Sequence, residues 1–489
     1  MIDGKQFIVT NRKFGYCDFL EISCKSTFIY YEKSLRISFA TDVDGCDWYL
    51  FGQAYCVNEY GKTPMDDIKE CHTDEIAKKY FFWTGRWCLF GNNQFHSDCV
   101  GLMSLYYFND NGQWYVTPSL HLIYDFNFTT FQNHKKNLFR NGCLDWFPAP
   151  LCRLNGVKRT VATQYLLLKG GEITPEFREN LNFKKNKYEI DRDKKVDLLC
   201  QYLKTGLKNI QKFSGKEIWL ALTGGGDSRT VLSALINQKI PFKTYLFDHP
   251  LITRGDKEIP FKIAEKNGFS HLYIKPKCKK SPKLLNEFDT HTFFSLNDAN
   301  RIFYARKQFE QIPSNVICIK SAVFEVGRGY YRNRIPNPNP SRQDFFRIIP
   351  DIGKFENYLK SLNLYFDWCE EHPIDMSLPD RYYMEERNGG WLANLEQAFE
   401  ICPWDSIHIA NSAAFVSEMV SLGVQKNNSK EINIACIQKM DAKLLEFPIN
   451  PPDIFSKLKY YFSRLIKNPF SVVKLQINKI NNRRFRKKL

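Results

Sequence analysis

The chain has 489 residues, of which 43% are hydrophobic and 15% aromatic, and its formal net charge is +16. This length allows two or three domains, and the composition excludes a disordered chain. The first residues lack the basic start and long apolar run of a secretion signal, and no window approaches the roughly 18 apolar residues of a membrane span. We therefore expect a cytoplasmic protein.

The positive charge is concentrated near the C-terminal end. Residues 457–489 contain eleven Lys and Arg and no acid, which leaves about +5 of the +16 for everything before them. The body of the chain therefore needs no nucleic-acid partner, and none is expected. The 15 cysteines are scattered without C-x-x-C pairs. This spacing favours buried reduced thiols over disulfides or a structural zinc site.

Residues 1–185 have the pattern of a β-rich domain. Short aromatic and β-branched runs alternate with Gly, Asp and Asn, as in STFIYYE, LRISFATD and DWYLFGQAYCV. Asn111-Gly112 lies between two such runs and predicts a hairpin turn. The charged stretch 185–195 is the best candidate for a domain boundary.

Residues 186–450 change to an alternation of helices and strands. Helices are predicted at about 196–213, from 228 onward and at about 257–266, with strands at 218–222, 243–247 and 271–274. This order implies βαβ units and a parallel sheet covered by helices on both faces. From about 284 to 445 the pattern is mainly helical, with a Pro/Asn-rich loop at 335–341.

A glycine-rich turn joins the predicted strand at 218–222 to the next helix. Such a turn lets backbone N–H groups approach a phosphate closely, at a helix N-terminus that favours anions. The alternative is a tight strand-to-helix turn with no ligand. The turn lacks the G-K-[ST] of a Walker loop and the G-x-G-x-x-G spacing of dinucleotide folds. Its residues are Thr223, Gly224, Gly225, Gly226, Asp227 and Ser228.

This turn resembles the S-G-G-x-D-S loop of the ATP pyrophosphatase superfamily, with Thr223 in place of the first Ser. Members of that superfamily cleave ATP between its α- and β-phosphates. The resemblance implies that ATP and Mg²⁺ are the cofactors. It also implies that residues 223–228 hold pyrophosphate and that Asp227 and Ser228 are catalytic, with Asp227 helping to hold the magnesium ion.

The rest of the chain resembles asparagine synthetase and its relatives. FEVGRGYYR is similar to the family segment D-E-x-x-x-G-Y, so Glu325 matches the catalytic second acid, while Phe324 stands where the family has Asp. Glu325 is alternatively a partner for Arg328. Arg387 matches the family's R-x-x-x-W and Lys430 falls near a basic residue of the family, which implies contacts with phosphate. Packing of Arg387 against Trp391 is the alternative.

The first 185 residues resemble the glutamine amidotransferase half of these proteins, through TGRWCLF, SDCVGLMSLYYF and LDWFPAPLCRLNGVKRTVATQYLLLKGG. The resemblance implies an Ntn-hydrolase-like αββα domain, followed by an ATP pyrophosphatase domain. The family's N-terminal cysteine nucleophile is missing, because residue 2 is Ile2 and the first cysteine is Cys17. A thiol inside the chain lacks the α-amine. We therefore expect a domain that does not hydrolyse glutamine.

Residues 451–489 form a basic tail in which DIFSKLKYYFSRLIKN predicts an amphipathic helix. Such a helix suits an anionic membrane surface and would place the protein at the inner face of the membrane. The alternatives are that its apolar face packs on the preceding domain, or that the tail binds an acidic polymer.

The resemblance implies an ATP-dependent ligase that joins a carboxylate to ammonia or an amine through an acyl-adenylate. A glycan or peptide precursor, especially one that bears a uronic acid, is the leading substrate class. Two alternatives stay open, namely an ATP pyrophosphatase that modifies RNA and a catalytically degenerate binding protein at a membrane. Phe324 and the missing nucleophile favour the degenerate protein, and the intact glycine loop favours the ligase.

Overall fold

A computed structural model gives the fold. It describes residues 4–15, 18–24, 26–131, 144–181, 183, 191–249, 252–296, 300–301, 306–332, 334–335, 337, 339–349, 351–422 and 431–451. Cys17, Lys430, most of the 185–195 boundary stretch and the basic tail from residue 452 onward lie outside these ranges.

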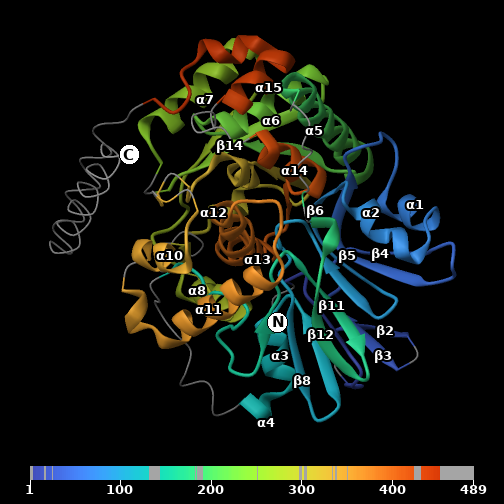
Figure 1. Ribbon diagram of the computed structural model, residues 1–489. Coiled ribbons are helices and arrows are strands. Elements are labelled where there is room, and N and C mark those ends of the chain that lie inside the picture. Colours follow the sequence, from blue (N-terminus) through green and yellow to red (C-terminus); the bar gives the residue numbers. More distant parts are fainter. Residues whose placement is uncertain are drawn as a thin grey trace.

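The first part of the chain forms two six-stranded antiparallel sheets (Figure 1). The first sheet has the order β10-β8-β9-β1-β3-β2, and the second has the order β12-β11-β7-β6-β5-β4. The predicted turn at Asn111-Gly112 joins β8 to β9, where Asp110 pairs with Gln113. The strands of the first sheet are β1 (Phe7–Thr10), β2 (Leu20–Cys24), β3 (Thr27–Tyr31), β8 (Tyr106–Asp110), β9 (Gln113–Thr117) and β10 (Lys158–Arg159). Those of the second are β4 (Ile37–Thr41), β5 (Asp47–Cys56), β6 (Trp83–Gly91), β7 (Gln94–Ser97), β11 (Gln164–Lys169) and β12 (Glu172–Phe177).

These two sheets pack face to face through one apolar core, in which the rings of Phe7 and Phe51 stack with centroids 4.1 Å apart. On its other face, the first sheet packs against α3 (Leu120–Phe126), through residues such as Ile8 and Ile123. The other face of the second sheet packs against α1 (Pro64–Lys69) and α2 (Ile76–Tyr80). The short helix α4 (Phe128–Phe131) follows α3.

The second part of the chain contains a five-stranded parallel sheet with the order β15-β14-β13-β16-β17. Side chains of one strand alternate between its two faces, so Ile218 and Leu220 enter one core while Trp219 enters another. The strands are β13 (Glu217–Ala221), β14 (Phe242–Phe247), β15 (His271–Ile274), β16 (Val316–Lys320) and β17 (Asp405–His408).

Helices cover both faces of this sheet. The core on one face includes residues of α5, α6, α7, α14 and α15, and the core on the other includes residues of α8 and α13. Asp191 caps α5 by accepting from the N–H groups of Asp193 and Lys194, and the helix ends at Gly215 with a φ of 65°. The helices are α5 (Arg192–Ser214), α6 (Gly226–Asn237), α7 (Arg254–Asn267), α8 (Pro282–His291), α10 (Arg342–Ile348), α11 (Glu356–Glu371), α12 (Leu378–Tyr382), α13 (Ala393–Phe399), α14 (Ala413–Leu422) and α15 (Glu431–Asp441).

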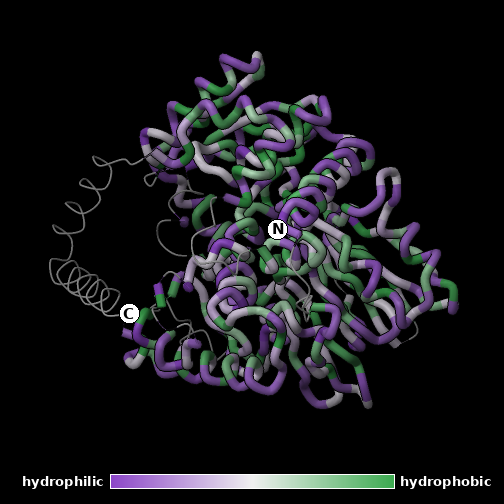
Figure 2. The backbone as a smooth tube through the Cα atoms, turned by 45° about the horizontal axis from the view of Figure 1, so that its top comes forward, coloured by the Kyte–Doolittle hydropathy of each residue, from purple (hydrophilic) through white to green (hydrophobic). Residues whose placement is uncertain are grey.

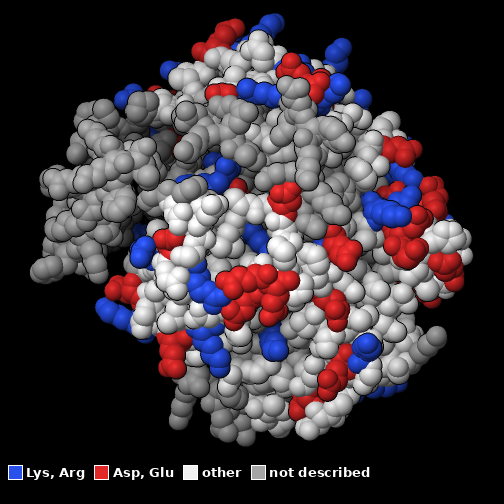
Figure 3. All heavy atoms as spheres, in the orientation of Figure 1, with Lys and Arg blue, Asp and Glu red and all other residues white. Residues whose placement is uncertain are grey.

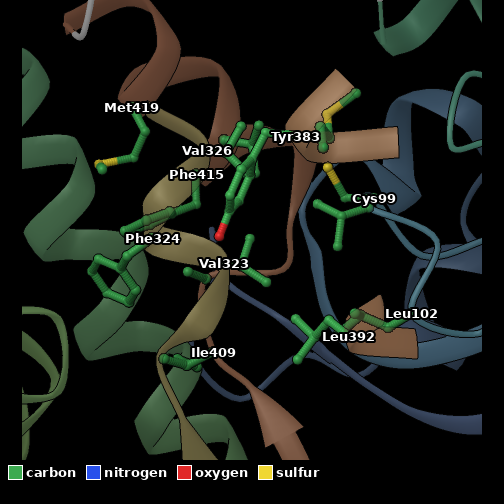
Figure 4. Close-up of a cluster of buried hydrophobic side chains, with 14 of the residues drawn as sticks. Cys99, Leu102, Val323, Phe324, Val326, Tyr383, Leu392, Ile409, Phe415 and Met419 are labelled. Atoms are coloured by element: carbon green, nitrogen blue, oxygen red, sulfur yellow. The ribbon is translucent and has the colours of Figure 1, made fainter. Parts of the chain in front are cut away.

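The two parts share a buried interface. Cys99 and Leu102 of the first part belong to the same apolar cluster as Leu392 and Ile409 of the second (Figure 4). Polar contacts cross the same interface, since Thr84 Oγ1 donates to the Ile409 carbonyl at 2.7 Å. In Figure 2, hydrophobic and hydrophilic stretches alternate along the chain, as expected for amphipathic elements packed on shared cores.

The predicted mixed α/β class, with antiparallel sheets and a helix-rich parallel-sheet part, is confirmed. The relation of the first part to Ntn hydrolases and the domain limits 1–185, 186–450 and 451–489 stay predictions.

Acidic and basic side chains are interspersed over the face shown in Figure 3. Among the described residues, no helix is long and apolar enough to cross a membrane.

Candidate functional site

The glycine loop lies at the point where the strand order of the parallel sheet reverses. Within the sheet, β14 and β15 follow on one side of the central strand β13, whereas β16 and β17 lie on its other side. Crevices at the carboxyl ends of strands at such a point are where open α/β sheets bind ligands. The loop leaves the carboxyl end of β13, and the short 3₁₀ helix η5 (Ala322–Arg328) follows the carboxyl end of β16.

Side chains hold several backbone N–H groups of the loop. The Thr223 N–H donates to Ser228 Oγ at 3.2 Å, and the Gly225 N–H donates to Thr223 Oγ1 at 3.2 Å. The Gly224 N–H donates to Asp256 Oδ1 at 3.0 Å. Helix α6 begins at Gly226 without a side-chain cap. The N–H groups of its first turn are therefore the donors that the loop leaves for an anion.

Close packing explains two of the three glycines. A Cβ on Gly224 would lie 3.0 Å from the Gly255 carbonyl oxygen, and one on Gly226 would lie 3.1 Å from Asn433 Nδ2. Neither position has a positive φ. A side chain at either position would push a neighbouring atom by a few tenths of an ångström, which favours the alternative that the loop is a tight turn with no ligand.

Asp227 is held by two side chains that are distant in sequence. Its Oδ2 accepts from Arg328 at 2.5 Å, and its Oδ1 accepts from Asn433 Nδ2 at 2.6 Å. Burial raises the pKa of Asp227 to about 6, against the opposing effect of the Arg328 guanidinium. Both carboxylate oxygens therefore already have partners within the protein.

Glu325 belongs to the same group of side chains. Its Oε1 lies 3.0 Å from Arg328, and its Oε2 accepts a hydrogen bond from the Tyr383 hydroxyl. Burial and the neighbouring Glu325 carboxylate raise the pKa of Tyr383 above its ordinary range, so this hydroxyl is a donor. The structure thus brings Asp227 and Glu325 together through Arg328. The alternative that Glu325 is a partner for Arg328 is therefore observed.

Arg387 lies among aromatic rings. It is on the π-helix η7 (Tyr383–Leu392), and its guanidinium carbon is 4.5 Å from the ring centroid of Trp391 and 5.0 Å from that of Tyr330. It also lies 5.9 Å from the Tyr383 ring. The expected packing against Trp391 is therefore observed, and the predicted phosphate contact stays a prediction.

Ser228 and Phe324 both have buried positions. Ser228 Oγ lies 3.2 Å from Thr223 Oγ1, so the hydroxyl forms part of the loop's own hydrogen bonding.

The Phe324 side chain packs against the Phe415 ring, with centroids 5.1 Å apart (Figure 4). Phe324, where the sequence resemblance would place an acid, is therefore part of the apolar core.

Two further contacts to the site involve residues that the sequence did not single out. Arg229 is fully buried and donates to four backbone carbonyls, at 2.6 Å to Phe447 and at 3.0–3.2 Å to Gly224, Leu444 and Pro448. Burial lowers its pKa to about 10. Arg229 directly follows the glycine motif, so the sequence could have indicated that it belongs to the site. No sequence pattern near Asn433 predicts its contact with Asp227.

The described residues do not fit a magnesium ion held by the protein. Mg²⁺ needs oxygen ligands in near-octahedral geometry and is usually held by one or two carboxylates together with substrate phosphates. Here the Asp227 oxygens accept from a guanidinium and an amide, and the guanidinium also contacts Glu325. Within the described ranges, no group of three His, Cys, Asp or Glu side chains could hold a metal ion.

Comparisons with known proteins give no family. No protein-family model matches the chain, and no curated protein matches it. Among solved structures, the chain is similar to "the allosteric regulatory enzyme of purine biosynthesis" at 8% identity, over 55% of this chain and 74% of that chain, with a TM-score of 0.23. A similarity at this TM-score indicates neither a shared fold nor a shared function.

Proposed function

We propose that this chain is an ATP-dependent ligase that adenylates a carboxylate and transfers its acyl group to ammonia or an amine. One observation carries the proposal. A strand, a glycine loop and an uncapped helix N-terminus meet two acids and a guanidinium at the point where the sheet order reverses. That arrangement offers backbone donors and one cation to a polyphosphate chain.

The proposed reaction has two steps. A carboxylate oxygen of the substrate attacks the α-phosphorus of ATP, the bond from that phosphorus to the bridging oxygen of the β-phosphate breaks, and pyrophosphate leaves. The nitrogen of ammonia or an amine then attacks the acyl carbon, the bond to AMP breaks, and the nitrogen loses a proton. ATP enters as its magnesium complex, so that ion arrives with the substrate.

The protein contributes binding and positioning in this scheme. The N–H groups at the start of α6 and the Arg328 guanidinium would stabilise the charge that develops on the leaving pyrophosphate. Asp256 helps to fix the loop, since it accepts from the Gly224 N–H with Oδ1 while its Oδ2 accepts from Thr253 Oγ1 at 2.7 Å. Arg229 holds the segment 444–448 against the loop.

A glycan or peptide precursor with a free carboxylate remains the proposed substrate class. We also propose a cytoplasmic location, with the tail 451–489 binding the inner face of a membrane. The second candidate is a binding protein that keeps the fold without activity. It is favoured by the burial of Phe324 and by the pairing of Asp227 and Glu325 with Arg328.

A turnover assay separates the ligase from the binding protein. ATP with magnesium and ammonia is supplied together with a panel of carboxylates that includes uronic acids, amino acids and acidic glycan fragments, and AMP and pyrophosphate are measured. The ligase produces both in equal amounts with at least one carboxylate, and Asp227→Ala abolishes this. Asp197→Ala, which removes an exposed carboxylate that pairs with Lys439, is the matched control. Absence of AMP with every carboxylate would favour the binding protein.

A further inference from the structure

Among the described residues, Arg328 is the only cationic side chain that contacts Asp227 or Glu325, the two predicted catalytic acids. One of its terminal nitrogens lies 2.5 Å from Asp227 Oδ2 and 3.0 Å from Glu325 Oε1. The guanidinium has five N–H donors, and among the described residues both acid contacts use the same terminal nitrogen, while the Nε is buried and out of reach of a ligand. Arg328 therefore keeps donors beyond those that the two acids occupy.

The position of Arg328 is fixed relative to the helix start. Asp227 is the second residue of α6, and its carboxylate contacts the guanidinium directly. Asn433 holds the other oxygen of Asp227 at 2.6 Å, which limits the rotation of the carboxylate. On the far side, Glu325 is itself held by the Tyr383 hydroxyl. The two acids and their partners thus fix the guanidinium beside the first turn of α6.

A divalent cation on Asp227 would either displace this guanidinium or lie beside its positive charge. Displacement would separate the Arg328 cation from two carboxylates, and a metal ion beside the guanidinium would be repelled by it. The neighbouring position that could have supplied another carboxylate is Phe324, which is buried in the apolar core. In this structure the charge of Asp227 is therefore balanced by the Arg328 guanidinium and not by a metal ion.

We infer that Arg328, and not a metal ion held by Asp227, is the residue that binds the pyrophosphate group, and that Asp227 positions Arg328 for that contact. The inference rests on the proposed function for the identity of the anion. A planar guanidinium can bind two phosphate oxygens at once, and a charge-assisted contact of this kind needs no metal. Asp227 acts through Arg328 and does not itself touch the phosphate.

Binding of inorganic pyrophosphate to the full chain, measured by calorimetry in EDTA, tests this assignment. We expect the wild-type chain to bind without metal and Arg328→Met to bind about tenfold to a hundredfold more weakly. Arg328→Lys keeps the charge but loses the planar fork, so its affinity should lie between the two. Arg347→Met removes an equal charge from an exposed side chain and should bind as the wild type does.

A double-mutant cycle tests the role of Asp227. Asp227→Asn should weaken pyrophosphate binding in the wild-type background and have no further effect in the Arg328→Met background, because the residue acts through the guanidinium. A purely structural role would give additive losses. Additive losses, or an Asp227→Asn effect that persists without Arg328, would refute the positioning role.

Several outcomes would overturn the inference. They are binding that requires magnesium and disappears in EDTA, binding that Arg328→Met leaves unchanged, and no binding by the wild type under either condition. If Arg328→Met does not fold, as judged by circular dichroism, the comparison uses Arg328→Lys. At least threefold weaker binding by the lysine variant then supports the inference, and unchanged binding overturns it.

The failure of this inference is distinguishable from that of the proposed function. Arg328-dependent binding of pyrophosphate without AMP formation from any carboxylate would reject the ligase and keep the anion site. AMP formation together with pyrophosphate binding that ignores Arg328 would reject the anion site and keep the ligase.

Discussion

Replacing Phe324 with Asp introduces a carboxylate next to Glu325, and we expect it to destabilise the fold and not to create a metal site. Only 1% of the Phe324 surface is exposed. Loss of a large buried aromatic side chain costs about 3–5 kcal/mol. Its edge-to-face contact with Phe415, at an interplanar angle of 66°, contributes about 0.5–1.5 kcal/mol beyond burial.

The new carboxylate adds a further cost of about 1–3 kcal/mol, because a buried polar group without a partner loses its hydration. We therefore expect Phe324→Asp to lower the free energy of unfolding by at least about 4 kcal/mol. Phe324→Leu also loses the ring contact and some volume but introduces no polar atom, so it should cost clearly less than Phe324→Asp. The leucine variant separates the effect of the charge from that of the altered shape.

Urea unfolding of the full chain, followed by circular dichroism and tryptophan fluorescence, measures both variants. Magnesium binding and AMP formation are measured on any Phe324→Asp protein that folds. A stability within about 1 kcal/mol of the wild type would show that the position can accommodate an ionised side chain. A gain of magnesium-dependent turnover would show in addition that the acid reaches the proposed ATP site, and the assignment of Phe324 to the core would then be wrong.

Three further predictions concern other parts of the chain. Burial raises the pKa of Glu386 to about 7, so the folded state keeps a proton that the unfolded state releases above about pH 4.5. The free energy of unfolding should therefore fall by up to about 3 kcal/mol between pH 4.5 and 7. Urea titrations across this range should show a smaller fall in Glu386→Gln. A wild type whose free energy of unfolding does not change with pH would contradict the prediction. Purified protein given glutamine should release no glutamate in a coupled assay, and a glutamate signal that disappears in Cys17→Ala would refute this expectation. Truncation after Pro452 should abolish sedimentation with anionic vesicles at low salt, because each basic residue of the tail contributes about 1 kcal/mol to binding. AMP formation should persist in the truncated protein. A wild type that does not sediment with such vesicles would refute the membrane role of the tail.

Local sequence patterns determined the order and type of the elements around the loop. The strand predicted at 271–274 matches β15, and the strand predicted at 243–247 matches β14 except for one added residue. Alternating apolar residues and turn residues act over a few positions, so they are readable without the rest of the chain. Helix α7 begins at Arg254, three residues before the predicted start, because Thr253 and Asp256 form a capping box that extends it.

The partners of the predicted site residues depended on the tertiary structure alone. Arg328 and Asn433 contact Asp227 from 101 and 206 residues away, and the strand order of the parallel sheet decides which segments meet there. Side-chain periodicity does not report whether the position of Phe324 faces the core or the site. The sequence alone determined the strand, glycine loop and helix, because these follow from local propensity. Which charge balances Asp227 was decided only by the fold, because that contact joins distant segments.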